Sequence, residues 1–280
     1  MATAKDIVLK PIDRKKANAL VKKIHYSGKV VQNSSIHIGV FLNGKLEGAM
    51  QFGSSLDKSK IIGLVSDTNW NEFIELNRMA FSDRLPRNSE SRAIAIAFKI
   101  LKKKAPHLKW VISYADACQC GDGAIYRASG FVLTGIKKNT QNYRLPFAKD
   151  LDIQNLKEKG LSDRDIQIIK AWLESITKRT HKMSLEGAPH AHKMSLEGEV
   201  RSSRLLSEIK IIMRKVTHGG TNSKKLFTLL GGAPAIGYQL RYIYFFSDRD
   251  RNNLTVQEIP FSKIKEIGAS MYKGVRSSVD

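Results

Sequence analysis

Three short stretches of this chain carry the side chains that could do chemistry, at positions 25–27, 87–92 and 116–126. The second stretch is a polar loop between a predicted strand and a predicted helix. Free backbone N–H groups at a helix start can hold a phosphate or pyrophosphate, and Arg87 and Arg92 would complete the neutralisation. Because the loop lacks a glycine-rich fingerprint, an ordinary capped helix beside a solvated loop is the alternative.

Asp116 stands at the end of a predicted strand, the edge at which open α/β sheets usually bind their ligands. Its carboxylate could act as a general base or position a substrate amine. Together with Cys118 and Cys120, it could instead hold one metal ion with His25 or Tyr26. The reduced cysteine pair could also simply pack, so the sequence leaves a metal site open.

Tyr126 and His25 each have two interpretations. The phenol of Tyr126 could donate a proton, or its ring could merely pack on the sheet. A lone histidine is more often structural than catalytic. The case for His25 depends on whether the end of the preceding helix points into the same crevice as Asp116.

The elements that must position these residues follow the order β-α-β-β-β-α-β-α-β. Helical spacing covers residues 13–24, and Asn43-Gly44 joins two apolar runs, which is a strong hairpin signal. A strand over 73–81 leads into the polar loop, and a helix over 91–104 leads to a buried strand ending at Asp116. This order predicts a mixed sheet with helices on its faces.

The chain beyond this core divides into two further parts. Residues 1–148 form the predicted core, 149–204 a helical insert, and 205–280 a C-terminal helix and strand that pack on the core. The strand in the last part is apolar on both faces, which predicts an interior strand of the N-terminal sheet.

The insert contains two amphipathic segments around Gly160, with Ser162 as the predicted N-cap. They could be a helix-turn-helix that reads DNA, a helical hairpin packed on the core, or a solvated insert. The heptapeptide HKMSLEG then occurs twice, at 181–187 and 192–198. Its histidines could hold a metal, although a local duplication within a loop is the simpler explanation.

The charge balance predicts a polyanionic partner. Lys and Arg total 47 against 26 Asp and Glu, which gives a net charge of +21. A ribosome, a membrane surface and duplex nucleic acid all satisfy charge alone. No segment has the length of apolar sequence that a signal peptide or membrane span needs, so we expect a cytoplasmic protein with reduced cysteines.

Two families share these motifs. The order strand, RNSESR loop, helix, strand and GDGAIYRASGF resembles the acyl-CoA-binding half of GNAT-type acyltransferases, although Asn88, Ser89 and Glu90 stand where their pyrophosphate loop has glycines. More specifically, the chain resembles the Mom family of phage DNA-modification proteins. The shared motifs are HYSGK, ELNRMAF, LPRNSESR, YAD, CGDGAIYRASGF, GYQLRYIYFF, IPFSKI and GASMYKG.

The resemblance implies a GNAT-like fold of the α/β (α+β) class, with a mixed, mostly antiparallel sheet flanked by helices and a helical insert. It implies an enzyme that converts adenine N6 in double-stranded DNA to a carbamoylmethyl-type derivative, which protects phage DNA from restriction. Acetyl-CoA or a related acyl-CoA is the implied donor. The target adenine would have to be flipped out, because its N6 cannot reach a crevice from within the duplex.

The residues that match the family motifs are the expected site. His25 and Tyr26 would line the acceptor side, Asp116 would orient or deprotonate the amine, and Tyr126 would protonate the leaving thiolate. The residues expected on the donor side are Arg78, Arg87, Asn88, Ser89, Ser91 and Arg92. A conventional GNAT N-acetyltransferase acting on an RNA or protein amine is the alternative enzyme, and a DNA-binding protein without catalysis is a third hypothesis.

Overall fold

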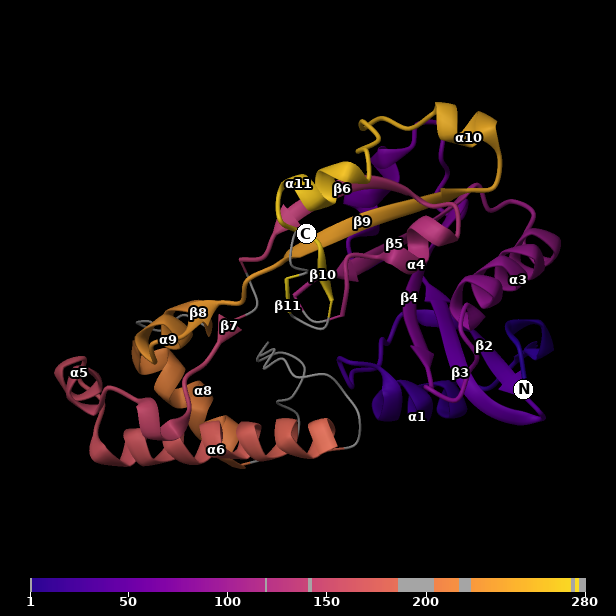
Figure 1. Ribbon diagram of the computed structural model, residues 1–280. Coiled ribbons are helices and arrows are strands. Elements are labelled where there is room, and N and C mark those ends of the chain that lie inside the picture. The colour runs from indigo at the N-terminus through magenta and orange to yellow at the C-terminus, as the bar shows by residue number, and fades with distance from the viewer. Residues whose placement is uncertain are drawn as a thin grey trace. The chain divides into compact units, whose positions relative to one another are not determined.

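The computed structural model describes residues 2–118, 120–140, 143–185, 204–216, 223–272 and 275–276. The backbone divides into two compact units (Figure 1). The first unit is Met1–Lys137 with Tyr238–Asp280, and the second is Lys138–Gly237. Within the described ranges, no helix combines the length and the apolar character that crossing a bilayer requires.

The first unit is built on a seven-stranded sheet with the order β1-β2-β3-β4-β5-β9-β6. The pairs β1–β2, β2–β3, β3–β4 and β5–β9 are antiparallel, whereas β4 and β5 run parallel. The predicted mixed, mostly antiparallel sheet is therefore confirmed. The strands are β1 (Val8–Pro11), β2 (Ser34–Leu42), β3 (Lys45–Gly53), β4 (Phe73–Phe81), β5 (Trp110–Asp116), β6 (Val132–Lys138) and β9 (Tyr238–Phe245).

Two predicted features of this sheet are confirmed. Asn43 and Gly44 join β2 to β3 with φ angles of 49° and 76°. Positive φ at both positions is what a type I′ hairpin turn needs. The apolar strand β9 lies inside the sheet between β5 and β6, so the chain returns to its first unit after leaving it.

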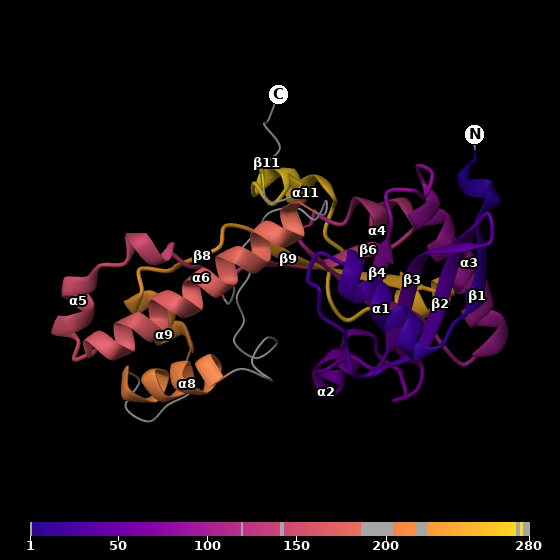
Figure 2. The same ribbon diagram turned by 90° about the horizontal axis from the view of Figure 1, so that it is seen from below.

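Helices cover both faces of the sheet. Helix α3 (Ser89–Lys104) buries Ile94, Phe98 and Leu101 in the same apolar cluster as Met50 and Phe52 of β3. Helix α1 (Arg14–Ile24) lies on the opposite face, where Asn18 accepts a hydrogen bond of 2.9 Å from Gln51, the residue between Met50 and Phe52. Figure 2 shows α1 in front of strands β2, β3 and β4.

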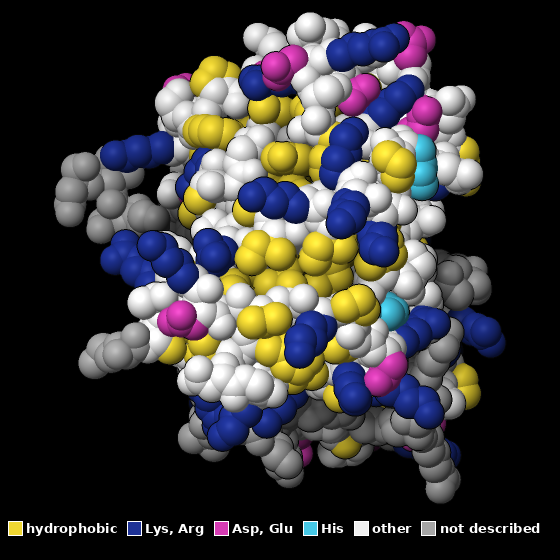
Figure 3. All heavy atoms as spheres, turned by 90° about the vertical axis from the view of Figure 1, so that its right-hand side faces the viewer, with side chains coloured by type: hydrophobic (Ala, Val, Ile, Leu, Met, Phe, Trp, Pro, Cys, Tyr) yellow, Lys and Arg dark blue, Asp and Glu magenta, His cyan; other side chains and the backbone are white. Residues whose placement is uncertain are grey.

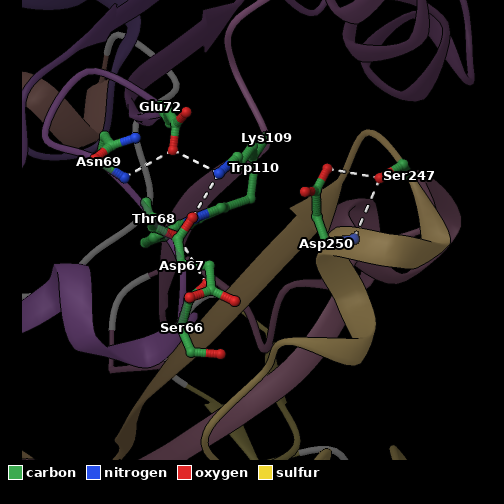
Figure 4. A network of polar contacts seen from close by, with 9 residues as sticks. All are labelled: Ser66, Asp67, Thr68, Asn69, Glu72, Lys109, Trp110, Ser247 and Asp250. Atoms are coloured by element: carbon green, nitrogen blue, oxygen red, sulfur yellow. Dashed lines mark hydrogen bonds and ion pairs between the residues drawn. The ribbon is translucent and has the colours of Figure 1, made fainter.

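The remaining elements of the first unit are short. They are the 3-10 helices at Ala4–Asp6 and Ile62–Leu64, and α2 (Lys58–Ile61), α4 (Ala124–Ala128), α10 (Asp248–Asn252), α11 (Ser262–Glu266), β10 (Met271–Tyr272) and β11 (Val275–Arg276). Near the first residues of β4 and β5, the Glu72 carboxylate accepts from the Asn69 N–H and pairs with Lys109, each at 2.7 Å (Figure 4). Trp110 donates to the Thr68 hydroxyl at 3.1 Å in the same network.

The second unit has its own apolar core. Its elements are β7 (Tyr143–Arg144), a 3-10 helix at Ala148–Asp150, α5 (Ile153–Glu158), α6 (Asp163–Leu185), α8 (Arg204–Val216), α9 (Ser223–Leu229) and β8 (Ala233–Pro234). Trp172 of α6, Ile212 of α8 and Phe227 of α9 share one buried cluster. Ser162 caps α6 as predicted, because its hydroxyl accepts from the Asp165 N–H at 3.2 Å.

Helix α8 belongs to the second unit. The sequence pattern groups residues 205–280 with the core, whereas α8 packs against α6 inside the second unit, which extends to Gly237. The two helices around Gly160 therefore belong to a small helical unit. The first HKMSLEG copy enters the last turn of α6 at His181–Leu185, while the second copy and the histidine side chains lie outside the described residues.

Phe98 provides a test of the first core. Its ring lies 4.4 Å from that of Tyr244 and 5.6 Å from that of Phe131, and it is 4 % exposed. Phe98→Ala should lower the free energy of unfolding of the first unit by about 3–5 kcal/mol, because a large cavity replaces the ring. Hydrogen exchange of the β5 amides measures this loss. The exposed neighbour Lys99→Ala is the control, and equal protection in the two variants would contradict the packing described.

Candidate functional site

Strands β4 and β5 separate after three paired residues. The parallel ladder joins Phe73 to Trp110, Ile74 to Val111 and Glu75 to Ile112, and it ends there. Each strand continues, but β4 pairs onward with β3 and β5 with β9. The two strands therefore diverge beyond Glu75 and Ile112.

Tyr26 lies at this divergence. Burial is the main cause that raises the pKa of its phenol; the nearby Asp116, Cys120 and Tyr126 raise it further, whereas Arg78 lowers it. These electrostatic interactions show that the four expected residues Tyr26, Arg78, Asp116 and Tyr126 gather in one place. The segment after α1, the end of β5, strand β4 and helix α4 each contribute one of them.

Arg78 holds the Tyr26 segment in position. Its Nε donates to the Lys29 carbonyl at 3.0 Å, and a terminal nitrogen donates to the Asn77 carbonyl at 2.7 Å. Burial lowers the pKa of this guanidinium, while Tyr26 and Glu75 raise it. The residue expected on the donor side therefore also fixes the backbone of the acceptor side.

Tyr126 closes the other side of the divergence. Its hydroxyl lies 2.9 Å from Ser113 Oγ, which is 3.1 Å from the Leu76 carbonyl, so Ser113 bridges β5, β4 and α4. Burial raises the pKa of Tyr126 to about 12, although its hydrogen bond with Ser113 lowers it. The phenol therefore carries its proton throughout the neutral range and can donate it.

Asp116 is buried at the end of β5 and begins a tightly held loop. One carboxylate oxygen accepts from the Cys118 N–H at 3.1 Å. Further along the loop, Arg127 donates to the Asp122 carboxylate at 3.0 Å, and the Tyr242 hydroxyl donates to the Asp122 carbonyl. The loop between β5 and α4 is thus fixed from both α4 and β9.

His25 packs beside the cluster, with its ring tilted by 30° to that of Tyr26. Its ring centroid lies 4.2 Å from that of Tyr26, and its Nδ1 lies 2.8 Å from Ser27 Oγ. The histidine is buried where α1 ends. The structure therefore places His25 where it can orient Tyr26.

Apart from Arg78, the expected donor residues form a separate group at the start of α3. Asn88 takes the left-handed conformation, with φ 68°, that a glycine would adopt in a tight loop, and its side chain makes no capping hydrogen bond. Helix α3 begins at Ser89, two residues earlier than predicted. Ser91 donates to the Asn88 carbonyl at 3.2 Å, while Arg87 and Arg92 are exposed.

This helix start has features that suit a phosphate. The hydroxyl of Ser89 is buried and has no hydrogen-bond partner among the described residues. A 16-residue helix also brings the positive end of its dipole to this point. The residues present therefore fit an anionic group such as the pyrophosphate of CoA.

A metal site receives no support from side-chain clustering. Among the residues that the structure describes, no three His, Cys, Asp or Glu side chains gather closely enough to hold an ion. The alternative in which Asp116, Cys118 and Cys120 share a metal is thus an untested expectation.

Two functional candidates escaped sequence reasoning. Ser113 and Glu75 are polar residues inside apolar strand segments, in WVISYAD and FIELNRMAF. A polar residue in a buried strand needs a partner, which is a signal that could have singled them out. Their partners come from distant segments, so the signal could not have said what they do.

Gly123 and Gly130 provide a matched test of the loop that follows Asp116. Both have positive φ, +84° and +79°, but an added Cβ would overlap the Tyr242 ring at Gly123 and reach only ordinary contact, 3.7 Å from Tyr244, at Gly130. Gly123→Ala should cost about 1–3 kcal/mol more unfolding free energy than Gly130→Ala, because only it overpacks the site. Urea unfolding measures both variants, and equal losses would argue against this packing.

Tyr126 also predicts a pH dependence of stability. Its folded pKa is about 12, so between pH 10 and 12 the unfolded chain loses a proton that the folded chain keeps. Unfolding then releases a proton, and stability falls by about 2–3 kcal/mol from Tyr126 over this window. Tyr126→Phe should reduce that fall by the same amount in urea titrations at each pH. An unchanged fall would show that the phenol is not buried as described.

Comparison with solved structures finds acetyltransferases. The "IAA acetyltransferase" from Bacillus cereus ATCC 14579 is 12% identical; the match covers 48% of this chain and 81% of that protein, with a TM-score of 0.33. A GNAT family acetyltransferase from Elizabethkingia anophelis with acetyl-CoA bound is 14% identical over 48% of this chain and 81% of its own, with a TM-score of 0.28. Similarities this low carry no argument about activity.

Comparison with sequences is more specific. The "Methylcarbamoylase mom" of Escherichia phage Mu is 40% identical over 125 residues, which are 44% of this chain and 52% of that protein. The matched part thus spans about half the length of this relative. The model of the Mom protein family matches residues 6–263, nearly the whole chain. The chain therefore belongs to the Mom protein family.

Proposed function

We propose that this protein is a DNA-modification enzyme that converts adenine N6 in double-stranded DNA to a carbamoylmethyl-type derivative, using an acyl-CoA donor. The observation that carries the proposal is the meeting of Tyr26, Arg78, Asp116 and Tyr126 at the divergence of β4 and β5 in a Mom family chain. The modified base would protect phage DNA from restriction. The name of the phage Mu relative, a methylcarbamoylase, supports the type of group transferred.

DNA is the partner that charge favours. The chain has a net charge of +21, and Lys and Arg clearly outnumber Asp and Glu on the face shown in Figure 3. Dispersed positive charge gives salt-dependent, mainly nonspecific phosphate binding. A target adenine within the stack cannot reach a site where Asp116 is buried, so the base is extruded before it reacts.

The donor would be held at the start of α3. Backbone N–H groups after Asn88 and the buried hydroxyl of Ser89 face the positive end of the helix dipole, and Arg87 and Arg92 add charge nearby. Such a donor supplies an activated carbonyl with a thiolate leaving group. The reactive arm of the donor would extend between the separated ends of β4 and β5 toward Asp116.

The chain's own residues would then move protons and fix the reactants. Asp116 accepts a hydrogen bond from the adenine amine and orients or deprotonates it. Tyr126, held beside Ser113, donates its proton to the leaving thiolate. His25 packs against Tyr26 and fixes its ring on the acceptor side.

In the carbamoylmethyl product adenine N6 is bonded to a methylene carbon, and the group carries an amide nitrogen; acyl transfer from a thioester forms a bond to the carbonyl carbon instead and supplies no nitrogen. The roles proposed for these residues are therefore limited to binding, orientation and proton transfer. A conventional N-acetyltransferase acting on RNA or protein would use the same donor site, so the test has to identify the product.

Asp116→Asn tests the transfer. Plasmid DNA from cells that express the wild-type protein should contain deoxyadenosine with added mass, and the variant should reduce that product by at least about a hundredfold, because general-base catalysis contributes this much. Mass spectrometry of digested nucleosides measures it. DNA binding should persist in the variant, which separates lost chemistry from lost binding.

The outcome of that experiment also decides between the alternatives. Deoxyadenosine without added mass in the wild-type sample would reject DNA modification and leave an acetyltransferase for RNA or protein. Equal restriction resistance in the wild type and Asp116→Asn would reject the proposed role of the carboxylate.

A further inference from the structure

Tyr114 occupies an unusual position in the sheet. All the other residues of β5 are buried, including Asp116, yet Tyr114 is 40% exposed near the centre of a seven-stranded sheet. An exposed aromatic ring offers a flat face on which a nucleic-acid base can stack. Neither the structural core nor the proposed transfer uses this ring.

Tyr114 faces the same side of the sheet as the acceptor residues. Side chains two positions apart in a strand share a face, so Tyr114 lies beside Asp116 on one side of β5. Ser113, which contacts Tyr126, points to the opposite side. Tyr114 therefore lies on the Asp116 side of the divergence.

Three charged side chains, Glu75, Arg241 and Asp57, interact electrostatically with the ring's hydroxyl. Burial raises the pKa of Tyr114 to about 12; the nearby Glu75 raises it further, and Arg241 lowers it. Arg241 is anchored, because it donates to the Thr134 carbonyl at 2.7 Å. Of the two carboxyl groups, Glu75 has the larger effect, and its partner Ile112 lies two residues before Tyr114 on the same face of β5.

Glu75 stands at the last rung before β4 and β5 separate, opposite Ile112. Burial raises the pKa of its carboxyl group, whereas the nearby polar side chains of Ser55 and Asn77 and the charge of Arg78 lower it. The group also interacts electrostatically with Tyr126. A half-buried carboxyl at the floor of the divergence has no part in the transfer described above.

We propose that Tyr114 and Glu75 form the subsite that recognises the extruded adenine, with the base stacked on the Tyr114 ring and its Watson–Crick edge hydrogen-bonded to Glu75. The proposal rests on the proposed function, because it places the acceptor base next to Asp116. It adds two specificity-determining residues and the kind of contact each makes.

The chemistry of adenine matches this pair. Its N6 amine donates to a carboxyl oxygen, and its N1 accepts from a carboxyl group that carries a proton. Bidentate pairing of a side chain with a base discriminates against wrong bases by roughly tenfold to a hundredfold, and stacking on an aromatic ring contributes similarly. A pyrimidine offers less stacking area, and guanine presents an acceptor where adenine has its amine.

The stacking half is tested with two synthetic duplexes, one fully paired and one with a single unpaired adenine. Fluorescence anisotropy gives the affinity of the full chain for each. The wild type should prefer the unpaired adenine, Tyr114→Phe should keep the preference, and Tyr114→Ala should lower it about tenfold. Trp70→Ala, an exposed aromatic residue before β4, is the matched control and should behave as the wild type.

The hydrogen-bonding half compares unpaired adenine with an unpaired purine that lacks the 6-amino group. The wild type should prefer adenine by about tenfold or more. Glu75→Leu should remove this preference, while Glu75→Gln should keep it, because a carboxamide offers the same acceptor and donor as a protonated carboxyl. Glu72→Leu is the control and should keep the preference, since Glu72 lies just before the same strand and pairs with Lys109 (Figure 4).

The two halves distinguish the subsite from the transfer. One result would overturn the subsite and leave the proposed function standing: the wild type modifies deoxyadenosine, but the Tyr114→Ala and Glu75→Leu variants bind both unpaired bases as the wild type does. The opposite result would support the subsite and reject the transfer: the preference for unpaired adenine depends on both residues, but the wild-type protein adds no mass to deoxyadenosine. Hydrogen exchange of β4 and β5 checks that each variant is folded.

Discussion

The early end of the ladder between β4 and β5 is the constraint on which the rest of the site depends. Backbone groups that leave a parallel ladder must find other partners, because buried unpaired N–H and C=O groups are costly. Here β3 and β9 hold the outer edges of the two strands, and on the inner edge the Ser113 hydroxyl donates to the Leu76 carbonyl across the divergence. The divergence is therefore held in place by strand pairing on its outer sides and by Ser113 between the two strands.

The side chains at this opening are held in place by groups from distant parts of the chain. Arg78 donates to the Lys29 carbonyl and so fixes the segment that carries Tyr26. On the other side, Tyr242 of β9 and Arg127 of α4 both bind Asp122 in the loop after Asp116. Strand β9 thus does more than complete the sheet, because it fixes the loop that begins at the candidate base.

The two faces of the sheet have different chemical character at the divergence. Ser113 and Tyr126 lie on the side of α3, whose first turn carries the buried hydroxyl of Ser89. Asp116, Glu75 and Tyr114 lie toward the other side, which α1 also covers. A donor that binds at the start of α3 and a base that binds on the opposite face would meet between the separated strands.

The sequence by itself determined the local features and the chemical groups. The hairpin at Asn43-Gly44 and the Ser162 cap follow from residues close in the chain, and the apolar pattern of 238–245 sufficed to place that strand inside the sheet. Asn88 shows the limit of motif reasoning, since an asparagine supplies the left-handed conformation for which a glycine was expected.

Only the tertiary structure decided where those groups meet. The point at which β4 and β5 separate, the contact of Ser113 with Leu76, and the position of Glu75 beside Tyr114 all depend on pairing between residues far apart in sequence. The packing of α8 against α6 rather than the sheet depends likewise on which apolar faces are complementary. Local patterns specify which face of an element is buried, but not which partner buries it.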